Sequence, residues 1–227
     1  MRDLVIASPH YWEIPPLYPT RPPYYLVESC KALGLTLEMW GRGELWPQYI
    51  RGKVLGGIAA IEKIEARHIL FTDSQDAFFC APEVEILEKY RRFKADLVVA
   101  GEANCYPNES FRDRYPTGGT YRFLNSGGLI GTKEAILDCL AKIRDYDGPD
   151  DDQFRLSSLF IEGYPLKIDT QAQIFQCMSV QPPLEIALCR PFNRDTSNWP
   201  CQLHFNGRTG GIDEWFTKCF GELHADV

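Results

Sequence analysis

Strand-like and helical segments alternate along the first half of the sequence, and this alternation limits the possible folds more than any other feature. Short β-rich apolar runs at 4–7, 35–39, 68–72 and 96–100 are separated by stretches in which apolar residues recur every three or four positions. Strands that alternate with helices are typical of an α/β protein, whose sheet is covered by helices. The sequence therefore predicts an α/β fold.

The second half predicts a mixed sheet rather than a simple alternation. Its elements, in order, are a strand-like run at 123–131, two helical patterns, and short strands near 166–169, 173–176 and 201–205. Long proline- and aromatic-rich stretches at 10–25 and 103–119 interrupt the pattern, and loops of that length often carry function. A chain of 227 residues with no linker composition predicts one domain over 1–227.

Charge and composition exclude several classes of protein. The net charge of -7 argues against a surface for nucleic acids or anionic lipids, which requires clustered Lys and Arg. No run approaches the ~20 apolar residues that span a bilayer, and the N-terminal residues show no signal-peptide pattern, so we expect a cytoplasmic protein without a membrane span. The eight cysteines contain no CxxC pair, and we expect buried thiols rather than a disulfide framework.

The segment HILFTDSQDAFF at 68–79 is the strongest indication of a site. An apolar strand runs directly into Asp73 and Asp76, and ligands of open α/β sheets bind at the carboxyl ends of the strands. Two carboxylates held close together repel each other unless a cation or a proton lies between them. Mg²⁺ or Mn²⁺ bridging phosphates would satisfy both. The alternative is a turn in which Asp73 and Ser74 cap backbone amides.

Two further segments place polar groups where a ligand would meet the sheet. Asn125 and Ser126 are followed by two glycines inside an otherwise apolar strand, which indicates either the close approach of a ligand or a bulge that bends the sheet. Three carboxylates at 150–152 stand at the start of a helical pattern. They would either cap the helix or serve as an acid/base group and hydrogen-bond partners in a pocket.

His204 leaves an apolar strand into a glycine-containing loop. A single histidine on such a strand is more often a hydrogen-bonded core residue. An imidazole would also complete a metal site begun by carboxylates, and it would favour Mn²⁺ over Mg²⁺ or Ca²⁺. Both interpretations remain open at this point.

Taken together, these segments resemble a known family. FTDSQD, GEANCYPN, FLNSGG, DDDQ, QIFQ and a His-x-Asn-Gly element occur in the same order as in the glycosyltransferase domain of the procollagen lysyl hydroxylase/glucosyltransferase enzymes, and in the related procollagen galactosyltransferase-like proteins. The resemblance extends from about residue 3 to about residue 210. The late element reads HFNGR where the family usually has His-Gly-Asn-Gly, so the chain departs from the family pattern directly after His204, where the resemblance implies the diphosphate contact.

The resemblance implies a GT-A-type glycosyltransferase fold with a Rossmann-like mixed central sheet flanked by helices. It implies Mn²⁺, with Mg²⁺ as the alternative, bound by Asp73, Asp76 and His204. The remaining implied roles are Ser8 and Trp46 at the uridine, Lys53 at the opening of the next helix near the nucleotide, Asn125 and Ser126 at the donor sugar, Asn206 and Gly207 beside the diphosphate, and Asp150, Asp151 and Asp152 as the catalytic acidic edge, with Asp151 favoured.

The predicted function is therefore transfer of a sugar, glucose or galactose, from a UDP-sugar to a hydroxyl acceptor on a protein or glycan. The resemblance covers the transferase region alone and does not imply collagen as the acceptor. One alternative is an inactive module that binds nucleotide-sugars. Another is a phosphohydrolase with an aspartate nucleophile, but that chemistry requires a second aspartate at the position that Gln75 occupies.

Overall fold

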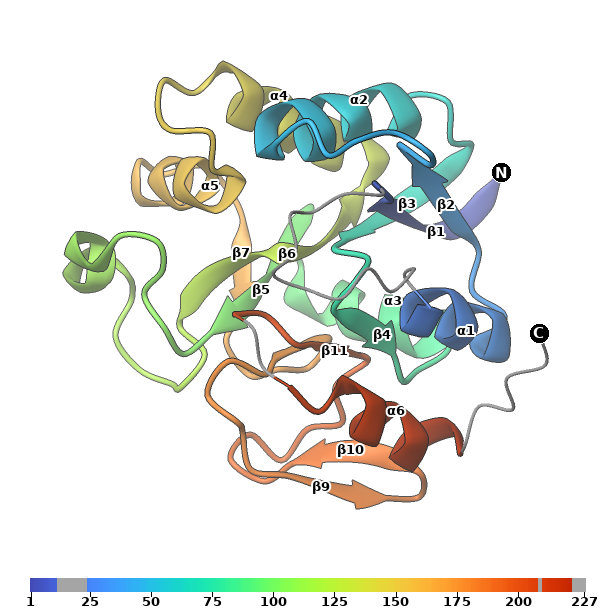
Figure 1. Cartoon of the computed structure of the whole chain (residues 1–227). Helices are drawn as coiled ribbons and strands as arrows, with labels where there is room; N and C mark the ends of the chain where they lie inside the picture. The colour runs from blue at the N-terminus through green and yellow to red at the C-terminus, as the bar shows by residue number, and fades with distance from the viewer. Residues whose placement is uncertain (12–23, 208–209, 222–227) are drawn as a thin grey trace.

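The structure is a computed structural model that describes residues 1–11, 24–207 and 210–221. Within these residues, six strands form the central sheet in the order β2-β1-β3-β6-β5-β7 (Figure 1). In that order the strands are β2 (Leu37–Trp40), β1 (Arg2–Pro9), β3 (Ala66–Thr72), β6 (Phe123–Thr132), β5 (Leu97–Glu102) and β7 (Lys167–Asp169). β1 pairs in parallel with β2 and β3, whereas β6 runs antiparallel to β3 and β5. The prediction of a mixed sheet is confirmed.

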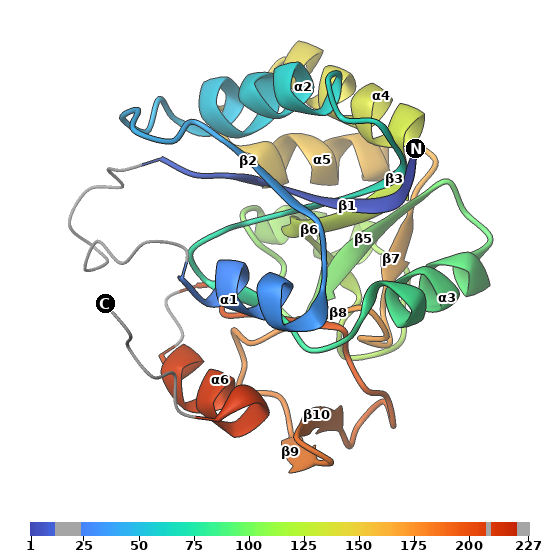
Figure 2. The same cartoon turned by 90° about the vertical axis from the view of Figure 1, so that its right-hand side faces the viewer.

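Helices cover both faces of this sheet (Figures 1 and 2). One face carries α2 (Gly56–Ile61), α4 (Lys133–Asp145) and α5 (Asp152–Ile161), and the other carries α1 (Tyr24–Leu33) and α3 (Glu83–Phe93). Successive side chains of a strand point to opposite faces, so Val5 belongs to the core cluster on the α4 side and Leu4 to the cluster on the α3 side. Burial on both faces explains why these strands are apolar along their whole length.

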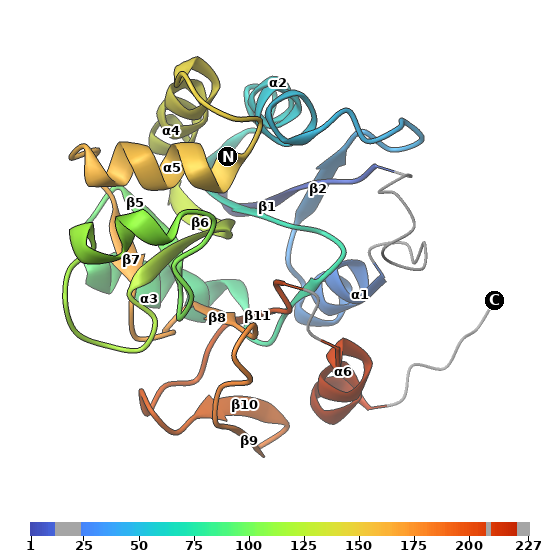
Figure 3. The same ribbon diagram turned by 60° about the vertical axis from the view of Figure 1, so that its left-hand side comes forward.

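A smaller sheet lies below the central one (Figure 3). It consists of β4 (Ala77–Phe79), β11 (Gln202–His204) and β8 (Phe175–Cys177). The hairpin of β9 (Leu184–Ala187) and β10 (Arg190–Asn193) and the helix α6 (Ile212–Phe220) complete this region. Phe78, Leu203 and Phe216 form its apolar centre.

The chain crosses from the large sheet to the small one at residues 73–76, between β3 and β4. Ala77 of β4 lies opposite His204 of β11, and the amide of Phe205 donates to the carbonyl of Asp76 at 2.7 Å. This antiparallel pairing brings residues that are far apart in the sequence to one place, beyond the carboxyl end of β3.

The sequence missed or misplaced several elements. β4, the β9–β10 hairpin and the 3-10 helix η2 (Glu109–Arg114) were not predicted. The helical segment after Trp46 begins as the π-helix η1 (Tyr49–Leu55), so Lys53 lies inside it and not at its start. Most of the stretch at 10–25, namely residues 12–23, lies outside the described residues. Among the residues that are described, no helix is both long and apolar enough to cross a lipid bilayer.

Candidate metal and donor site

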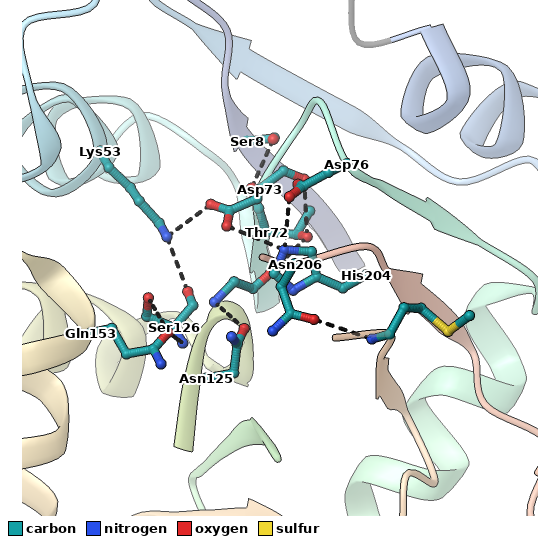
Figure 4. A network of polar contacts seen from close by, with 12 residues as sticks. Ser8, Lys53, Thr72, Asp73, Asp76, Asn125, Ser126, Gln153, His204 and Asn206 are labelled. Carbon is teal, nitrogen blue, oxygen red and sulfur yellow. Dashed lines mark hydrogen bonds and ion pairs between the residues drawn. The ribbon is translucent and has the colours of Figure 1, made fainter. Parts of the chain in front are cut away.

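Asp73, Asp76 and His204 meet where β3 ends (Figure 4). His204 Nε2 lies 3.5 Å from Asp73 Oδ2 and 3.4 Å from Asp76 Oδ2. One ligand atom from each side chain lies within 4.8 Å of the others. Two carboxylate oxygens and one imidazole nitrogen at this separation could hold a divalent cation, and the aspartates are partly exposed, which leaves room for exogenous ligands.

The hydrogen bonding of His204 fits a metal ligand better than a core histidine. Its side chain is buried and Nε2 lies near the two aspartate carboxylates, yet within the described residues neither ring nitrogen makes a hydrogen bond. A buried polar group without a hydrogen bond costs about 1–3 kcal/mol. Burial alone would lower the pKa of His204, but the carboxylates of Asp76 and Asp73 outweigh burial and raise it. Burial would raise the pKa of Asp76, and His204 outweighs it in the other direction.

Gly127, the first of the two glycines of β6, makes room for this arrangement. An added Cβ on Gly127 would lie 2.0 Å from His204 Cε1 and 2.8 Å from Asp73 Oδ2. The pairing of β5 with β6 shifts register between Val99, opposite Leu129, and Ala100, opposite Asn125. The interpretation of this segment as a bulge is therefore confirmed, and the bulge also permits the close approach of side chains.

Lys53 forms ion pairs with both Asp73 of the candidate metal site and Asp152 at the start of α5. Its Nζ lies 2.8 Å from Asp73 Oδ1 and 2.8 Å from Asp152 Oδ2, and it donates to the carbonyl of Ser126 at 3.2 Å. Burial would lower the pKa of Lys53, but Asp152 and Asp73 outweigh burial and raise it. Three carboxylates, those of Asp73, Asp76 and Asp152, face one lysine, and a histidine that binds a metal is neutral, so a divalent cation would balance the excess negative charge.

The irregular helix around Lys53 has a local cause. The carbonyl of Gly52 accepts hydrogen bonds from Tyr11 Oη at 3.1 Å and from Trp40 Nε1 at 2.9 Å. Side-chain donors that bind a helical carbonyl interrupt regular α-helical bonding, and π-helical turns of this kind are frequent at functional sites. The turn directs the lysine into the sheet.

The three consecutive aspartates do different things. Asp150 Oδ1 accepts from the amide of Ile50 at 2.9 Å in η1. Asp151 is the N-cap of α5 and accepts from the amide of Phe154 at 2.8 Å, so the capping interpretation is confirmed for this residue. Asp152, buried beside Lys53, is the one whose carboxylate faces the cluster.

Glu102, at the end of β5, was not singled out in the sequence. It joins three polar side chains beside the site through hydrogen bonds. Its Oε1 accepts from Asn125 Nδ2 at 3.0 Å and Gln153 Nε2 at 2.7 Å, and its Oε2 accepts from Asn206 Nδ2 at 3.0 Å. Burial raises the pKa of Glu102, against the opposing effect of these bonds. Its position at the end of an apolar strand is the one feature of the sequence that could have indicated a functional residue. Its three partners come from distant segments of the chain.

The same network fixes residues that were expected to meet the donor. Asn125 Oδ1 accepts from the amide of Gly127, and Gln153 Oε1 accepts from both the amide and the hydroxyl of Ser126. Asn206 Oδ1 accepts from the amides of Met178 and Ser179. In this structure Asn125, Gln153 and Asn206 therefore accept hydrogen bonds from backbone amides around the site.

The other expected donor residues surround the cluster at its edges. Ser8 is buried and donates to the carbonyl of Thr72 at 2.8 Å, tying β1 to the end of β3. Trp46 packs edge-on against Tyr11 and Tyr49, with ring centroids 5.2 and 5.6 Å apart. Gly207 follows Asn206 with φ 74°, a conformation that favours glycine.

Replacing Glu102 with Gln is expected to destabilise the fold. The new amide group would present a donor to neighbours that are donors themselves, at a cost of about 1–3 kcal/mol. For a chain of this size that corresponds to a melting temperature roughly 3–10 °C lower, measured by calorimetry. Glu109→Gln, at an exposed position in η2, is the control and should leave the melting temperature unchanged. Equal melting temperatures for both variants would contradict a tightly bonded Glu102.

Most of the chain matches a known family of domains. A family described as the PLOD GT domain matches residues 24–210. The chain belongs to this glycosyltransferase-domain family. The match contains Lys53, Asp73, Asp76, Asp152 and His204, and the resemblance read from the sequence is confirmed.

Related proteins agree with this assignment. Procollagen-lysine,2-oxoglutarate 5-dioxygenase 1 of Bos taurus is 28% identical over 202 residues, covering 80% of this chain and 27% of that protein. The multifunctional procollagen lysine hydroxylase and glycosyltransferase LH3 of Homo sapiens is 30% identical over 166 residues, covering 66% of this chain and 22% of that protein. The chain thus spans about a quarter of the length of these relatives.

A solved structure supports the fold. A glycosyltransferase involved in the glycosylation of the major capsid of PBCV-1 superposes with a TM-score of 0.51 at 15% identity, covering 90% of this chain and 93% of that one. The mixed sheet flanked by helices is therefore a GT-A-type glycosyltransferase fold, as predicted.

Proposed function

We propose that the protein transfers a sugar, glucose or galactose, from a UDP-sugar to a hydroxyl group of a protein or glycan acceptor. The observation that carries the proposal is the cluster of Asp73, Asp76 and His204 at the end of β3, in a chain that belongs to a glycosyltransferase-domain family. Neither nitrogen of the buried imidazole has a hydrogen-bond partner among the described residues, which supports a role as a ligand.

A divalent cation would be held by Asp73, Asp76 and His204. The nitrogen ligand favours Mn²⁺, with Mg²⁺ as the alternative. When bound, the ion would neutralise negative charge on the departing diphosphate.

The neighbouring side chains have distinct proposed tasks. Lys53, which is buried and cationic, would bind a phosphate oxygen once its pairing with Asp73 is relieved by the cation. Trp46 would pack against the uracil ring from the side of η1. Ser8 and Gly207 would contact the donor through the strand end and the loop backbone. Asn125, Ser126 and Asn206 would support the donor sugar and diphosphate from below through the Glu102 network.

The acidic edge contributes through Asp152. Its carboxylate lies beside Lys53, whereas Asp151 is committed to the helix cap and Asp150 to η1. The proposed role of Asp152 is to bind the donor sugar and stabilise the positive charge that develops on it during transfer. We therefore prefer Asp152 to Asp151 as the residue that stabilises the reacting sugar.

The triplet offers its own matched test. Asp152→Asn is expected to lower sugar transfer about 100-fold, because the amide removes a charge near the reacting sugar. Asp150→Asn should stay within about threefold of the wild type, since the asparagine Oδ1 can still accept from the exposed amide of Ile50. Transfer is measured as UDP release at saturating donor. A larger loss for Asp150→Asn than for Asp152→Asn would overturn the assignment.

The decisive experiment on the function itself is a donor screen. The protein is incubated with Mn²⁺ and single UDP-sugars, and UDP release is followed with and without hydroxyl acceptors such as hydroxylysine peptides and simple glycosides. Release with UDP-glucose or UDP-galactose is expected. Donor-induced thermal stabilisation without any release would indicate an inactive binding module, and cleavage of phosphate esters instead would indicate a phosphohydrolase.

A further inference from the structure

Two cysteines lie side by side where α6 packs against β4. Cys80 directly follows β4 and is buried, and Cys219 lies in the last turn of α6 and is partly exposed. Cys80 belongs to the apolar cluster of Phe78 and Phe216, Cys219 packs against the same cluster, and the two thiols interact electrostatically. Phe216, one turn before Cys219, packs edge-on against Phe78 with ring centroids 5.2 Å apart, which holds the two elements together.

The surroundings make the two thiols unequal. Burial, together with Cys219, raises the pKa of Cys80, whereas the hydrogen bond from Cys80 outweighs burial at Cys219 and lowers its pKa. Arg190, whose guanidinium is paired with Glu85 at 2.7 and 2.9 Å, is a charged neighbour of both thiols. The thiolate is the reactive form, and an exposed thiol is more accessible to an oxidant than a buried one. The partly exposed Cys219 is therefore expected to be the nucleophile and the buried Cys80 the resolving thiol.

A third cysteine nearby is already engaged. The carbonyl of Cys201 accepts from the amide of Cys80 at 2.7 Å, but the thiol of Cys201 is directed to the carbonyl of Gln173 at 3.8 Å. Among the described residues, no group of three metal-type ligands includes any of these cysteines. The arrangement is that of a pair of thiols and not of a zinc site.

We propose that Cys80 and Cys219 are a thiol modification site that forms a reversible disulfide, fastening α6 to β4. With a small-molecule disulfide such as oxidised glutathione as the oxidant, the Cys219 thiolate attacks one sulfur, forms a mixed disulfide and releases one glutathione thiolate. Cys80 then gives its proton to the released thiolate and attacks the Cys219 sulfur, displacing the second glutathione. Two protein thiols are oxidised, and one glutathione disulfide is reduced to two thiols.

The bond would close a large covalent loop around the site. The segment from 80 to 219 contains β5, β6, α5 and β11, which supply Glu102, Gly127, Asp152 and His204. Cross-linking the ends of a long loop restricts the unfolded chain and stabilises the folded one. The disulfide would thus stabilise the segment of the chain that contains these site residues, independently of which sugar is transferred.

The test uses the full chain treated with oxidised glutathione and then with dithiothreitol. Peptide mapping by mass spectrometry is expected to find a Cys80–Cys219 crosslink with a loss of roughly 2 Da, the two thiol hydrogens. The melting temperature should rise by about 5–12 °C and return after reduction. Cys219→Ser, at a partly exposed position that should tolerate the change, is expected to abolish both effects.

Two comparisons keep the result interpretable. Cys189→Ser removes an exposed cysteine on the β9–β10 turn and should leave the crosslink and the melting shift intact. Cys80→Ala should leave Cys219 carrying a stable mixed disulfide with glutathione, because the resolving thiol is gone. Glutathione retained on Cys219 of the wild type, or a crosslink that involves Cys189 or Cys201 instead, would overturn the proposal.

Discussion

Asp76→Asn is expected to lower Mn²⁺-dependent UDP release about 100-fold or more, because the amide weakens one of the two anionic ligands of the proposed cation. The loss should also appear without turnover. At a metal concentration about 100-fold above Kd, binding stabilises a folded protein by about 2.7 kcal/mol, or roughly 5–10 °C for a chain of this size. The wild type should show this Mn²⁺-induced rise in melting temperature, and Asp76→Asn should lose it.

The structure suggests how to separate this effect from general damage. Asp76 is partly exposed and its backbone carbonyl, which accepts from Phe205, is unchanged by the substitution, so the metal-free variant should fold. Asp145→Asn is a matched control, since Asp145 pairs with Arg144 on the surface. It should keep both the melting rise and the turnover. A full Mn²⁺-induced rise in Asp76→Asn would show that the cation binds elsewhere.

Most of the fold was predictable because it follows from local patterns. The apolar runs that became β1, β3 and β5 are buried on both faces, so their composition alone marked them as central strands. The β9–β10 hairpin gave no such signal. Its turn residues, Leu188 and Cys189, have φ values of 50° and 57°, a conformation usually taken by Asn and Gly in hairpin turns. β4 was missed because its residues follow Asp76 directly, so the segment 68–79 was interpreted as one strand that ends in two carboxylates.

The residues alone pointed to the site only where its members are neighbours in the sequence. Asp73 and Asp76 were evident because a strand ends in them, whereas His204 was joined to them by the family resemblance. The choice between Asp151 and Asp152 depends on which of the two carboxylates caps α5. A shift of the helix start by one residue would exchange their roles, and the sequence does not fix the start that closely. Glu102 gains its importance from Gln153 and Asn206, 51 and 104 positions away. No local pattern encodes such contacts.

Gly127→Ala is expected to abolish metal binding although it replaces none of the proposed ligands. The methyl group would lie 2.0 Å from His204 Cε1 and 2.6 Å from its Nδ1, far inside contact distance, so the imidazole is displaced from its position beside the two aspartates. A misplacement of about 1 Å at a catalytic group can cost about 100-fold in rate. UDP release should fall by about that factor, and the Mn²⁺-induced rise in melting temperature should disappear.

Gly128→Ala is the matched control, one residue along the same strand. Its methyl group would point to the opposite side and meet the ring of Phe175 at 2.7 Å, within the apolar core. Overpacking of this kind costs about 1–3 kcal/mol, so the variant should melt at a lower temperature yet keep its response to Mn²⁺. If both variants lost the response to Mn²⁺, bending of β6 would be the cause. If only Gly127→Ala lost it, a glycine is required at 127 because His204 occupies the space that a side chain would fill.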